Sequence, residues 1–353
     1  MSRFFSNKYR SLVPYTPGEQ PTERKYIKLN TNESPFPPSD KAVAAAAEAA
    51  RLLQLYPDPT CGELTAAVAT LCGVQADEVL LTNGSDEILN FAFMAFCDDE
   101  HPAVFPDISY GFYKVFAELN GVPYRTVPLK DDLSIDPADY AAAGGTVFIA
   151  NPNAPTGLAL SPAEVEGILQ ANPNNVVVID EAYVDFGAES CVSLVHKYDN
   201  LLVTQTFSKS RSMAGARLGF GVGCAALIQD LNTVKYSTNP YNINRMTMAA
   251  GLGVLADEAY TQANCRAVCA TRTQTREALL QLGFEVAESK TNFLFARHRG
   301  FGGAELYAKL KENGILVRHF NQPRIQDYIR ITIGSSQEMQ VFVNTLRTIL
   351  EEC

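Results

Sequence analysis

Short, continuously apolar runs alternate along this chain with stretches of helical periodicity, and this alternation constrains the fold more than any other feature. A strand that is apolar throughout is buried on both faces, which is typical of a parallel sheet covered by helices. The expected strands are EVLLT (78–82), AVFP (103–106), YRTVPL (124–129), TVFIA (146–150), NVVVID (175–180), NLLVTQT (200–206) and GFGVG (219–223). We therefore predict an α/β fold with a mostly parallel, seven-stranded sheet sandwiched by helices.

The segments on either side of this alternation differ from it in pattern. The first 35 residues contain several prolines and are typical of an extended arm. A helix is predicted over 40–56, and after a long helical region (242–282) strands and helices alternate in a smaller unit. We expect an arm (1–35) that packs with the small domain, a large domain (36–250) and a small α+β domain (251–353).

Charge and cysteine usage exclude several classes of function. The 353 residues include 29 Lys and Arg against 39 Asp and Glu, a net charge of −10, which disfavours binding to nucleic acid or to an anionic membrane. An anionic small molecule remains compatible with a few converging arginines. The eight cysteines are scattered without a CxxC pair, so we expect no metal and reduced thiols. The start of the chain lacks a signal-peptide core and no apolar run could span a membrane, which predicts a cytoplasmic location.

Polar loops follow several of the expected strands, at the sheet edge where doubly wound folds bind ligands. In TNGSDE (82–87), Gly84 and Ser85 begin a helix whose free N–H groups suit a phosphate. Taken alone, the motif is explained more simply by an ordinary helix cap at Ser85 or Asp86. The loop NPNAPTG (151–157) is rigid enough to hold an asparagine side chain in one position, or is simply a βα connection.

A carboxylate and a lysine are expected at that same edge. Asp180 ends an apolar strand, and a buried carboxylate is costly unless it meets a cation such as a protonated aromatic nitrogen. Glu181 should point to the opposite face and have a structural or exposed role. In TFSKSRSMAGARLGF (206–220), Lys209 could be a solvated charge or a nucleophile towards carbonyls. Arg217 follows it before the next strand, and we expect Arg211 to be a solvated surface charge.

The combination of these groups at one edge favours a single interpretation. A phosphate cradle, a lysine, an arginine, an acid at a buried strand end and an asparagine are what pyridoxal 5'-phosphate requires of a protein. No single motif among them requires that cofactor.

The motifs also resemble a known family in their order along nearly the whole chain. They are LVPYTPGEQP, IKLNTNESPFPP, LYPDPT, TNGSDE, FPDISYGFY, NPNAPTG, VVVIDEAYVDF, TFSKSRSMAGARLGF, PYNIN, GILVRHF and YIRITIG. The sequence resembles the fold-type I pyridoxal-phosphate enzymes of the aspartate-aminotransferase-like superfamily, and more closely the histidinol-phosphate aminotransferases. It departs mildly from the family at DISYGFY and SRSMAGAR.

The resemblance implies a role for each matching residue. Lys209 would form the Schiff base with the cofactor and move the proton at the substrate Cα, while Asp180 would keep the pyridinium nitrogen protonated. Asn153 and Tyr183 would bind the phenolic oxygen, and Tyr110 would stack on the ring unless it is a core tyrosine. The expected ligands of the cofactor phosphate and its surroundings are Gly84, Ser85, Asp86, Thr206, Ser208 and Arg217. Tyr56 would reach the partner subunit's cofactor in a homodimer with shared active sites, and Arg330, Arg318 and Tyr15 would bind the anionic substrate.

The implied reaction is transamination of L-histidinol phosphate with 2-oxoglutarate, which gives imidazole-acetol phosphate and glutamate in histidine biosynthesis. Three alternatives share the fold: an aromatic or broad-specificity aminotransferase, a phosphothreonine decarboxylase, and a non-catalytic regulator with an added DNA-binding segment. The first 35 residues lack a helix-turn-helix pattern, which disfavours the regulator.

Overall fold

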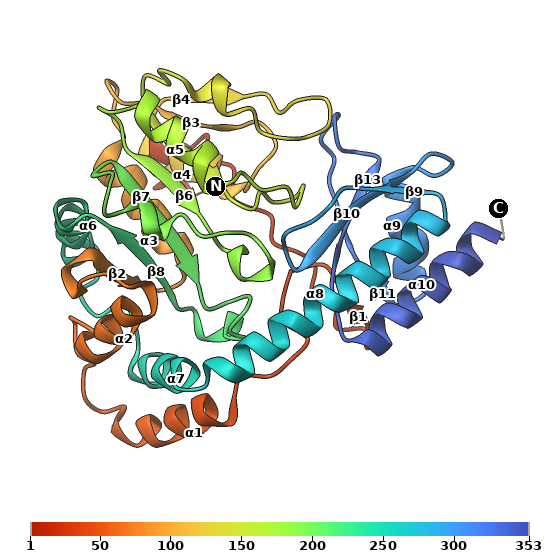
Figure 1. Cartoon of the computed structure of the whole chain (residues 1–353), viewed down its shortest axis with the longest axis horizontal. Coiled ribbons are helices and arrows are strands. Elements are labelled where there is room, and N and C mark those ends of the chain that lie inside the picture. The colour runs from red at the N-terminus through yellow and green to blue at the C-terminus, as the bar shows by residue number, and fades with distance from the viewer. Residues whose placement is uncertain (1, 352–353) are drawn as a thin grey trace.

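The core of the computed structural model, which describes residues 2–351, is a seven-stranded sheet (Figure 1). Met1 of the predicted arm and Cys353 lie outside the described residues. The strands occur in the order β2-β8-β7-β6-β5-β3-β4, and β8 alone among them runs antiparallel to its neighbours. Their bounds are β2 (Val79–Thr82), β3 (Ala103–Pro106), β4 (Tyr124–Val127), β5 (Thr146–Ala150), β6 (Val177–Asp180), β7 (Leu201–Thr206) and β8 (Gly219–Gly223). The predicted α/β fold with a mostly parallel sheet is confirmed.

Helices cover both faces of this sheet because successive strand side chains point in opposite directions. On β6, Val177 and Ile179 belong to the core beneath one layer of helices, while Val178 belongs to the core on the other face. The first layer contains α2 (Gly62–Cys72), α5 (Pro162–Ala171) and α7 (Arg245–Leu255), and the second contains α3 (Ser85–Phe96), α4 (Phe112–Asn120) and α6 (Ala225–Thr238).

The first helix is shorter than predicted. The pattern predicts a helix over 40–56, but α1 spans Asp40–Ala49 and a 3-10 turn follows over Ala50–Leu52. The first part packs closely on α7, since a Cβ added at Gly253 would lie 2.6 Å from the Cα of Ala42. Leu52, Leu53 and Leu55 are instead 45%, 56% and 55% exposed, so no packed face supports a longer helix.

A second unit follows α7. Its four-stranded antiparallel sheet has the order β12-β13-β10-β9, and the N-terminal arm joins it because β1 (Ile27–Lys28) pairs in parallel with β11 (Ile315–Leu316). Helix α8 (Glu258–Gln281) runs from the large sheet towards this unit (Figure 1). The other elements are β9 (Phe284–Val286), β10 (Phe293–His298), α9 (Gly303–Glu312), β12 (Arg318–His319), β13 (Tyr328–Thr332) and α10 (Ser336–Glu351).

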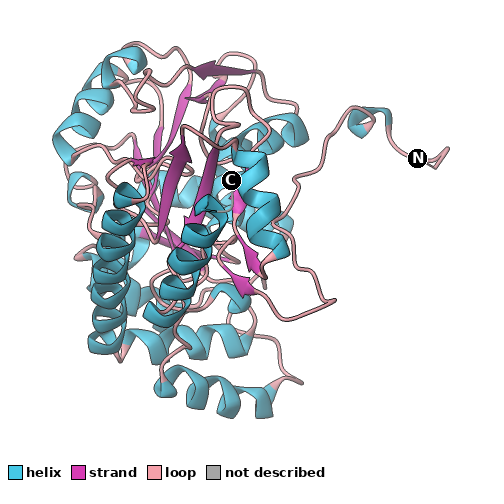
Figure 2. Cartoon of the chain, turned by 90° about the vertical axis from the view of Figure 1, so that its right-hand side faces the viewer, coloured by secondary structure: helices cyan, strands magenta, loops and turns pink. Residues whose placement is uncertain are grey.

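The predicted domain boundary at 250/251 falls inside α7, and the division into domains stays a prediction. The first residues of the arm extend away from the body of the protein (Figure 2). Within residues 2–351, no helix combines the length and the apolar character needed to cross a membrane.

Candidate active site

A pocket lies at the carboxyl ends of β5, β6 and β7, where doubly wound folds bind ligands. Thr31, Glu33, Ala150, Ala154, Ala182 and Ala214 contribute to its walls. The predicted site residues that line it are Ser85, Asp86, Tyr110, Asp180, Tyr183, Thr206, Ser208, Lys209 and Arg217. The parallel sheet therefore brings together groups that are more than 100 residues apart in the chain.

Asp180 is held at the base of this pocket as a buried carboxyl group. It is 5% exposed and accepts hydrogen bonds from the Ala182 N–H (3.2 Å), the Thr204 hydroxyl (3.3 Å) and the Tyr113 hydroxyl (3.3 Å). Burial, together with the negative charge of Asp86, raises the pKa of Asp180 to about 6, although these hydrogen bonds oppose the rise. A bound cation would favour the ionised carboxylate, so the site fits a protonated ring nitrogen.

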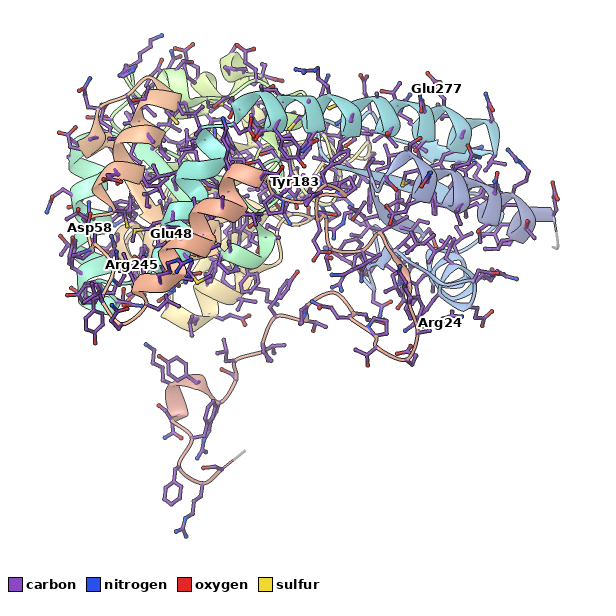
Figure 3. The ribbon with its side chains drawn as sticks, turned by 90° about the horizontal axis from the view of Figure 1, so that it is seen from below. Arg24, Glu48, Asp58, Tyr183, Arg245 and Glu277 are labelled. Atoms are coloured by element: carbon purple, nitrogen blue, oxygen red, sulfur yellow. The ribbon has the colours of Figure 1, made fainter. Side chains whose placement is uncertain are left out.

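Lys209 follows β7 and is half-buried in the same pocket. Its Nζ donates to the carbonyl oxygen of Thr31 at 3.4 Å and lies 5.8 Å from the ring centre of Tyr183. The Tyr183 hydroxyl accepts a hydrogen bond from Asn32 Nδ2 at 2.8 Å. Figure 3 shows Tyr183 at the junction between the two parts of the chain. Amine and phenol thus face a shared space.

The expected phosphate cradle is formed where α3 begins. Gly84, with φ 76° and ψ 164°, precedes the helix and provides no side-chain cap, so the first N–H groups are open to a ligand. Arg217 Nη2 lies 2.9 Å from Asp86 Oδ2, and its Nη1 lies 3.4 Å from Ser208 Oγ. The Thr206 hydroxyl donates to Ser208 Oγ at 3.0 Å. Helix N-terminus, hydroxyls and guanidinium converge as a phosphate requires.

Tyr110 is among the residues that line the pocket, whereas Asn153 is not. Tyr110 lines the pocket just before α4, and its hydroxyl donates to Asp86 Oδ1 at 2.5 Å. Burial raises the pKa of Tyr110 well above its usual value. Asn153 is buried, accepts from the Ser109 hydroxyl at 2.8 Å and donates to the Ile108 carbonyl at 3.0 Å.

The expected substrate residues gather beside the arm. Arg330 Nη2 donates to the Asn30 carbonyl at 3.0 Å, and within the described residues its buried Nε has no hydrogen-bond partner. Burial lowers the pKa of Arg330. Arg318 donates to the Thr16 and Pro17 carbonyls at 3.2 and 3.3 Å, which ties the arm to β12. An unpaired guanidinium N–H suits an incoming anion.

Tyr15 and Tyr56 present their rings outside the cofactor pocket. Tyr15 stacks on Phe112 with ring centres 4.2 Å apart. Tyr56 is 79% exposed and stacks on Tyr241 at 4.7 Å, and Arg245 Nη2 donates to its carbonyl at 2.7 Å. Arg245 lies on the large part of the chain, away from Tyr183 (Figure 3). Tyr56 therefore does not line the pocket of its own chain.

Comparison with known proteins decides the family. Residues 24–346 match the model of aminotransferase class I and II. Histidinol-phosphate aminotransferase 2 of Dechloromonas aromatica is 51% identical over 355 residues, which cover 99% of both chains. Histidinol-phosphate aminotransferase 1 of Bordetella parapertussis is 52% identical over 354 residues, again 99% of both chains. The chain belongs to the histidinol-phosphate aminotransferase family.

Solved structures show the same fold at lower identity. The histidinol-phosphate aminotransferase of Sinorhizobium meliloti, solved in complex with pyridoxal-5'-phosphate, has a TM-score of 0.90 and 23% identity, and the match covers 100% of this chain and 99% of that one. The enzyme of Clostridium acetobutylicum has a TM-score of 0.85 and 22% identity, with coverage of 93% and 100%.

The expectation that Arg211 is exposed on the surface of this aminotransferase was wrong. Arg211, expected as a solvated surface charge, has a side chain only 4% exposed and pairs with Asp185 at 3.0 Å. Its partner lies 26 residues earlier, in the loop after β6, so the local sequence could not reveal the pairing. Glu181 is buried as a structural group, bonded to the Ser190 hydroxyl at 2.7 Å and to Gln205 at 2.9 Å.

Sequence reasoning also missed several site residues of the aminotransferase. Two residues of the arm, Thr31 and Glu33, line the pocket, and Asn32 donates a hydrogen bond to the Tyr183 hydroxyl. The run of polar residues NTNES (30–34) was the sequence signal that could have indicated them. Tyr113, three residues after Tyr110, donates to Asp180. Gly219 is required by close approach, since a Cβ there would lie 2.4 Å from the backbone nitrogen of Ser85.

Proposed function

We propose that this protein transfers the amino group of L-histidinol phosphate to 2-oxoglutarate, with pyridoxal 5'-phosphate as cofactor, and releases imidazole-acetol phosphate and glutamate in histidine biosynthesis. The observation that carries the proposal is the pocket itself, in which Lys209 and the buried Asp180 lie together with Ser85 at the start of α3. Relatives named for this activity, at about half identity over the whole chain, support the choice of substrate.

The pocket offers a partner for each charged end of the cofactor. The buried carboxyl of Asp180 suits the ring nitrogen, and the open N–H groups at Ser85 suit the phosphate. When bound, pyridoxal phosphate supplies a carbonyl carbon that an amine can attack and a ring that withdraws electrons from the substrate Cα.

Each residue of the chain then has a definite task. The Lys209 amine would hold the cofactor and would move the proton at the substrate Cα. Asp180 keeps the ring nitrogen protonated, which favours electron withdrawal. Tyr183 would bind the phenolic oxygen, and Tyr110 would cover the ring face. Asn153 would join Tyr183 once its amide releases the Ile108 carbonyl or the Thr156 hydroxyl, to which it donates in this structure.

The cofactor phosphate would be held by backbone N–H groups, hydroxyl groups and a guanidinium. Its proposed ligands are Gly84, Ser85, Thr206, Ser208 and Arg217. Asp86 orients this group, since its two oxygens accept from Arg217 and from Tyr110. A salt bridge that already holds the arginine in place lowers the ordering cost of binding.

The anionic end of the substrate is bound by Arg330, with Arg318 and Tyr15 beside it. The buried, unpaired Nε of Arg330 among the described residues supports this role. The guanidinium fork matches both phosphate and carboxylate, so one clamp would serve both histidinol phosphate and 2-oxoglutarate.

The proposal includes a homodimer with shared active sites. Tyr56 is 79% exposed, and Leu53 and Leu55, close to it in the sequence, are 56% and 55% exposed. A second copy of the chain would cover these apolar side chains. In that dimer Tyr56 reaches the cofactor phosphate of the partner. A cytoplasmic location is also part of the proposal and stays a prediction.

Half-reactions of the holoenzyme test the proposed function. Histidinol phosphate should change the absorption band of the bound cofactor, and 2-oxoglutarate should restore it and yield glutamate. If histidinol phosphate leaves the spectrum unchanged while phenylalanine or tyrosine changes it, the protein is an aromatic aminotransferase instead. Release of carbon dioxide from phosphothreonine would identify a decarboxylase.

A further inference from the structure

The ion pair between the buried Arg211 and the half-buried Asp185 lies beside the candidate active site and has no part in the chemistry described so far. Arg211 Nη1 lies 3.0 Å from Asp185 Oδ2, and the Arg211 side chain is 4% exposed. The Ser210 hydroxyl donates to the same carboxylate oxygen. The guanidinium carbon also lies 5.2 Å from the ring centre of Phe207. A buried charge is kept only where a firm partner compensates it.

Each partner belongs to a loop that contains an active-site residue. Asp185 lies in the short 3-10 turn Val184–Phe186, two residues after Tyr183 and five after Asp180. Arg211 lies two residues after Lys209, in the loop that follows β7. The pair therefore connects the end of β6, which provides the acid and the phenol, with the loop that provides the amine.

The Asp185 side of this connection is fixed from outside the pocket. Arg272 Nη1, from α8, donates to the Phe186 carbonyl at 2.8 Å, and Cys269 Sγ lies 3.3 Å from the same oxygen. The loop that contains Lys209 and Arg211 is closed at its base by the Met213 N–H, which donates to the Phe207 carbonyl at 3.0 Å. The Ser212 hydroxyl ties the loop to Ser34 of the arm at 2.8 Å. Neither of these bonds joins the loop to the turn after β6, whereas the pair of Arg211 with Asp185 does. The pair thus anchors the lysine loop to an already fixed turn.

We infer that Asp185 and Arg211 are positioning residues, which set the Lys209 amine against Tyr183 and Asp180. They act through the lysine loop and do not contact the substrate. This inference rests on the proposed function, and it predicts that loss of either partner lowers kcat about 10- to 100-fold with little change in KM, since misplacement by about 1 Å has that effect.

Four holoenzyme variants test the inference: Asp185→Asn, Arg211→Met, their double variant, and Asn172→Ala as a control. Asn172 is buried and precedes β6, so it lies near the start of that strand, whereas Asp180 lies at its end. Its side chain accepts a hydrogen bond from the Ala143 N–H and donates to the Tyr140 and Ile168 carbonyls. Its loss should lower the thermal midpoint but leave kcat and the visible circular dichroism of the bound cofactor unchanged. The two single variants should change both kcat and this dichroism band, which reports how the protein holds the cofactor.

The double variant separates a coupled pair from two independent residues. If the partners act through each other, it loses no more kcat than the worse single variant; losses that multiply would overturn the inference. It is also overturned if both single variants lose stability as Asn172→Ala does but keep wild-type kcat and dichroism.

A milder variant keeps the inference testable if the others fail to fold. Ser210→Ala removes one hydrogen bond to Asp185 and should give a smaller loss of kcat with a small change in dichroism, while wild-type values for both would contradict the inference. The dichroism is measured without substrate, so its result does not depend on which substrate the enzyme uses. If the proposed function is wrong, the wild-type enzyme will not convert histidinol phosphate.

Discussion

Replacing Gly84 with alanine should weaken cofactor binding through one added methyl group. Gly84 has φ 76° and ψ 164°, a conformation almost restricted to glycine, and a side chain there costs about 1–3 kcal/mol of stability. The new Cβ would also lie 2.6 Å from Arg217 Nη2. The arginine can move away, but it then leaves Asp86 and the proposed phosphate site. Loss of one charged hydrogen bond, about 1.5–3 kcal/mol, corresponds to a roughly 10- to 150-fold higher Kd.

Titration of the cofactor-free protein with pyridoxal phosphate measures this effect, and Gly121→Ala provides the control. Gly121 also has a positive φ, 72°, at the end of α4, but a Cβ there would meet no described heavy atom within 4 Å. Both variants should unfold at lower temperature, and only Gly84→Ala should lose cofactor affinity. Equal affinity for the cofactor in the two variants would refute the reasoning about the cradle.

Three further predictions concern other parts of the site. Arg330→Ala should raise KM about 10-fold or more for both histidinol phosphate and 2-oxoglutarate in steady-state assays, and an effect on one alone would show two separate anion clamps. Burial raises the pKa of Asp180 to about 6, so the folded cofactor-free protein holds this proton at a pH where the unfolded chain has released it. Part of its stability should therefore be lost as the pH rises from about 4 to about 6. Asp180→Asn should remove that part when thermal midpoints are measured against pH, and an unchanged pH profile would contradict the assignment. Mixing inactive Tyr56→Ala with inactive Lys209→Ala should restore activity, since a mixed dimer contains one intact shared site; no recovery after verified subunit exchange would argue against sharing.

The large sheet could be predicted closely from the sequence because its signals are local. Runs rich in apolar and β-forming residues predicted all seven strands, with differences of one or two residues at their ends. The strand predicted over 124–129 ends at Val127, since Pro128 has no N–H to donate to a neighbouring strand. Lys209, Asp180 and Ser85 could be placed together because parallel strands present their carboxyl ends at one edge.

Contacts between distant segments could not be predicted in this way. Arg211 is buried only because Asp185 comes from the loop after another strand, and the approach of the arm to Lys209 depends on the pairing of β1 with β11. Likewise, the residue at which α1 ends depends on how far the helix packs against α7. Each of these features depends on tertiary packing that overrides the local pattern.

Glutamate formation from histidinol phosphate and 2-oxoglutarate, measured for the wild-type enzyme and for Lys209→Ala, tests the central claim most directly. We expect the wild-type enzyme to form one glutamate for each histidinol phosphate consumed, and the Lys209→Ala variant, folded and stable, to form none above background. A wild-type enzyme that forms glutamate from phenylalanine but not from histidinol phosphate, or a Lys209→Ala variant with wild-type turnover, would contradict the account.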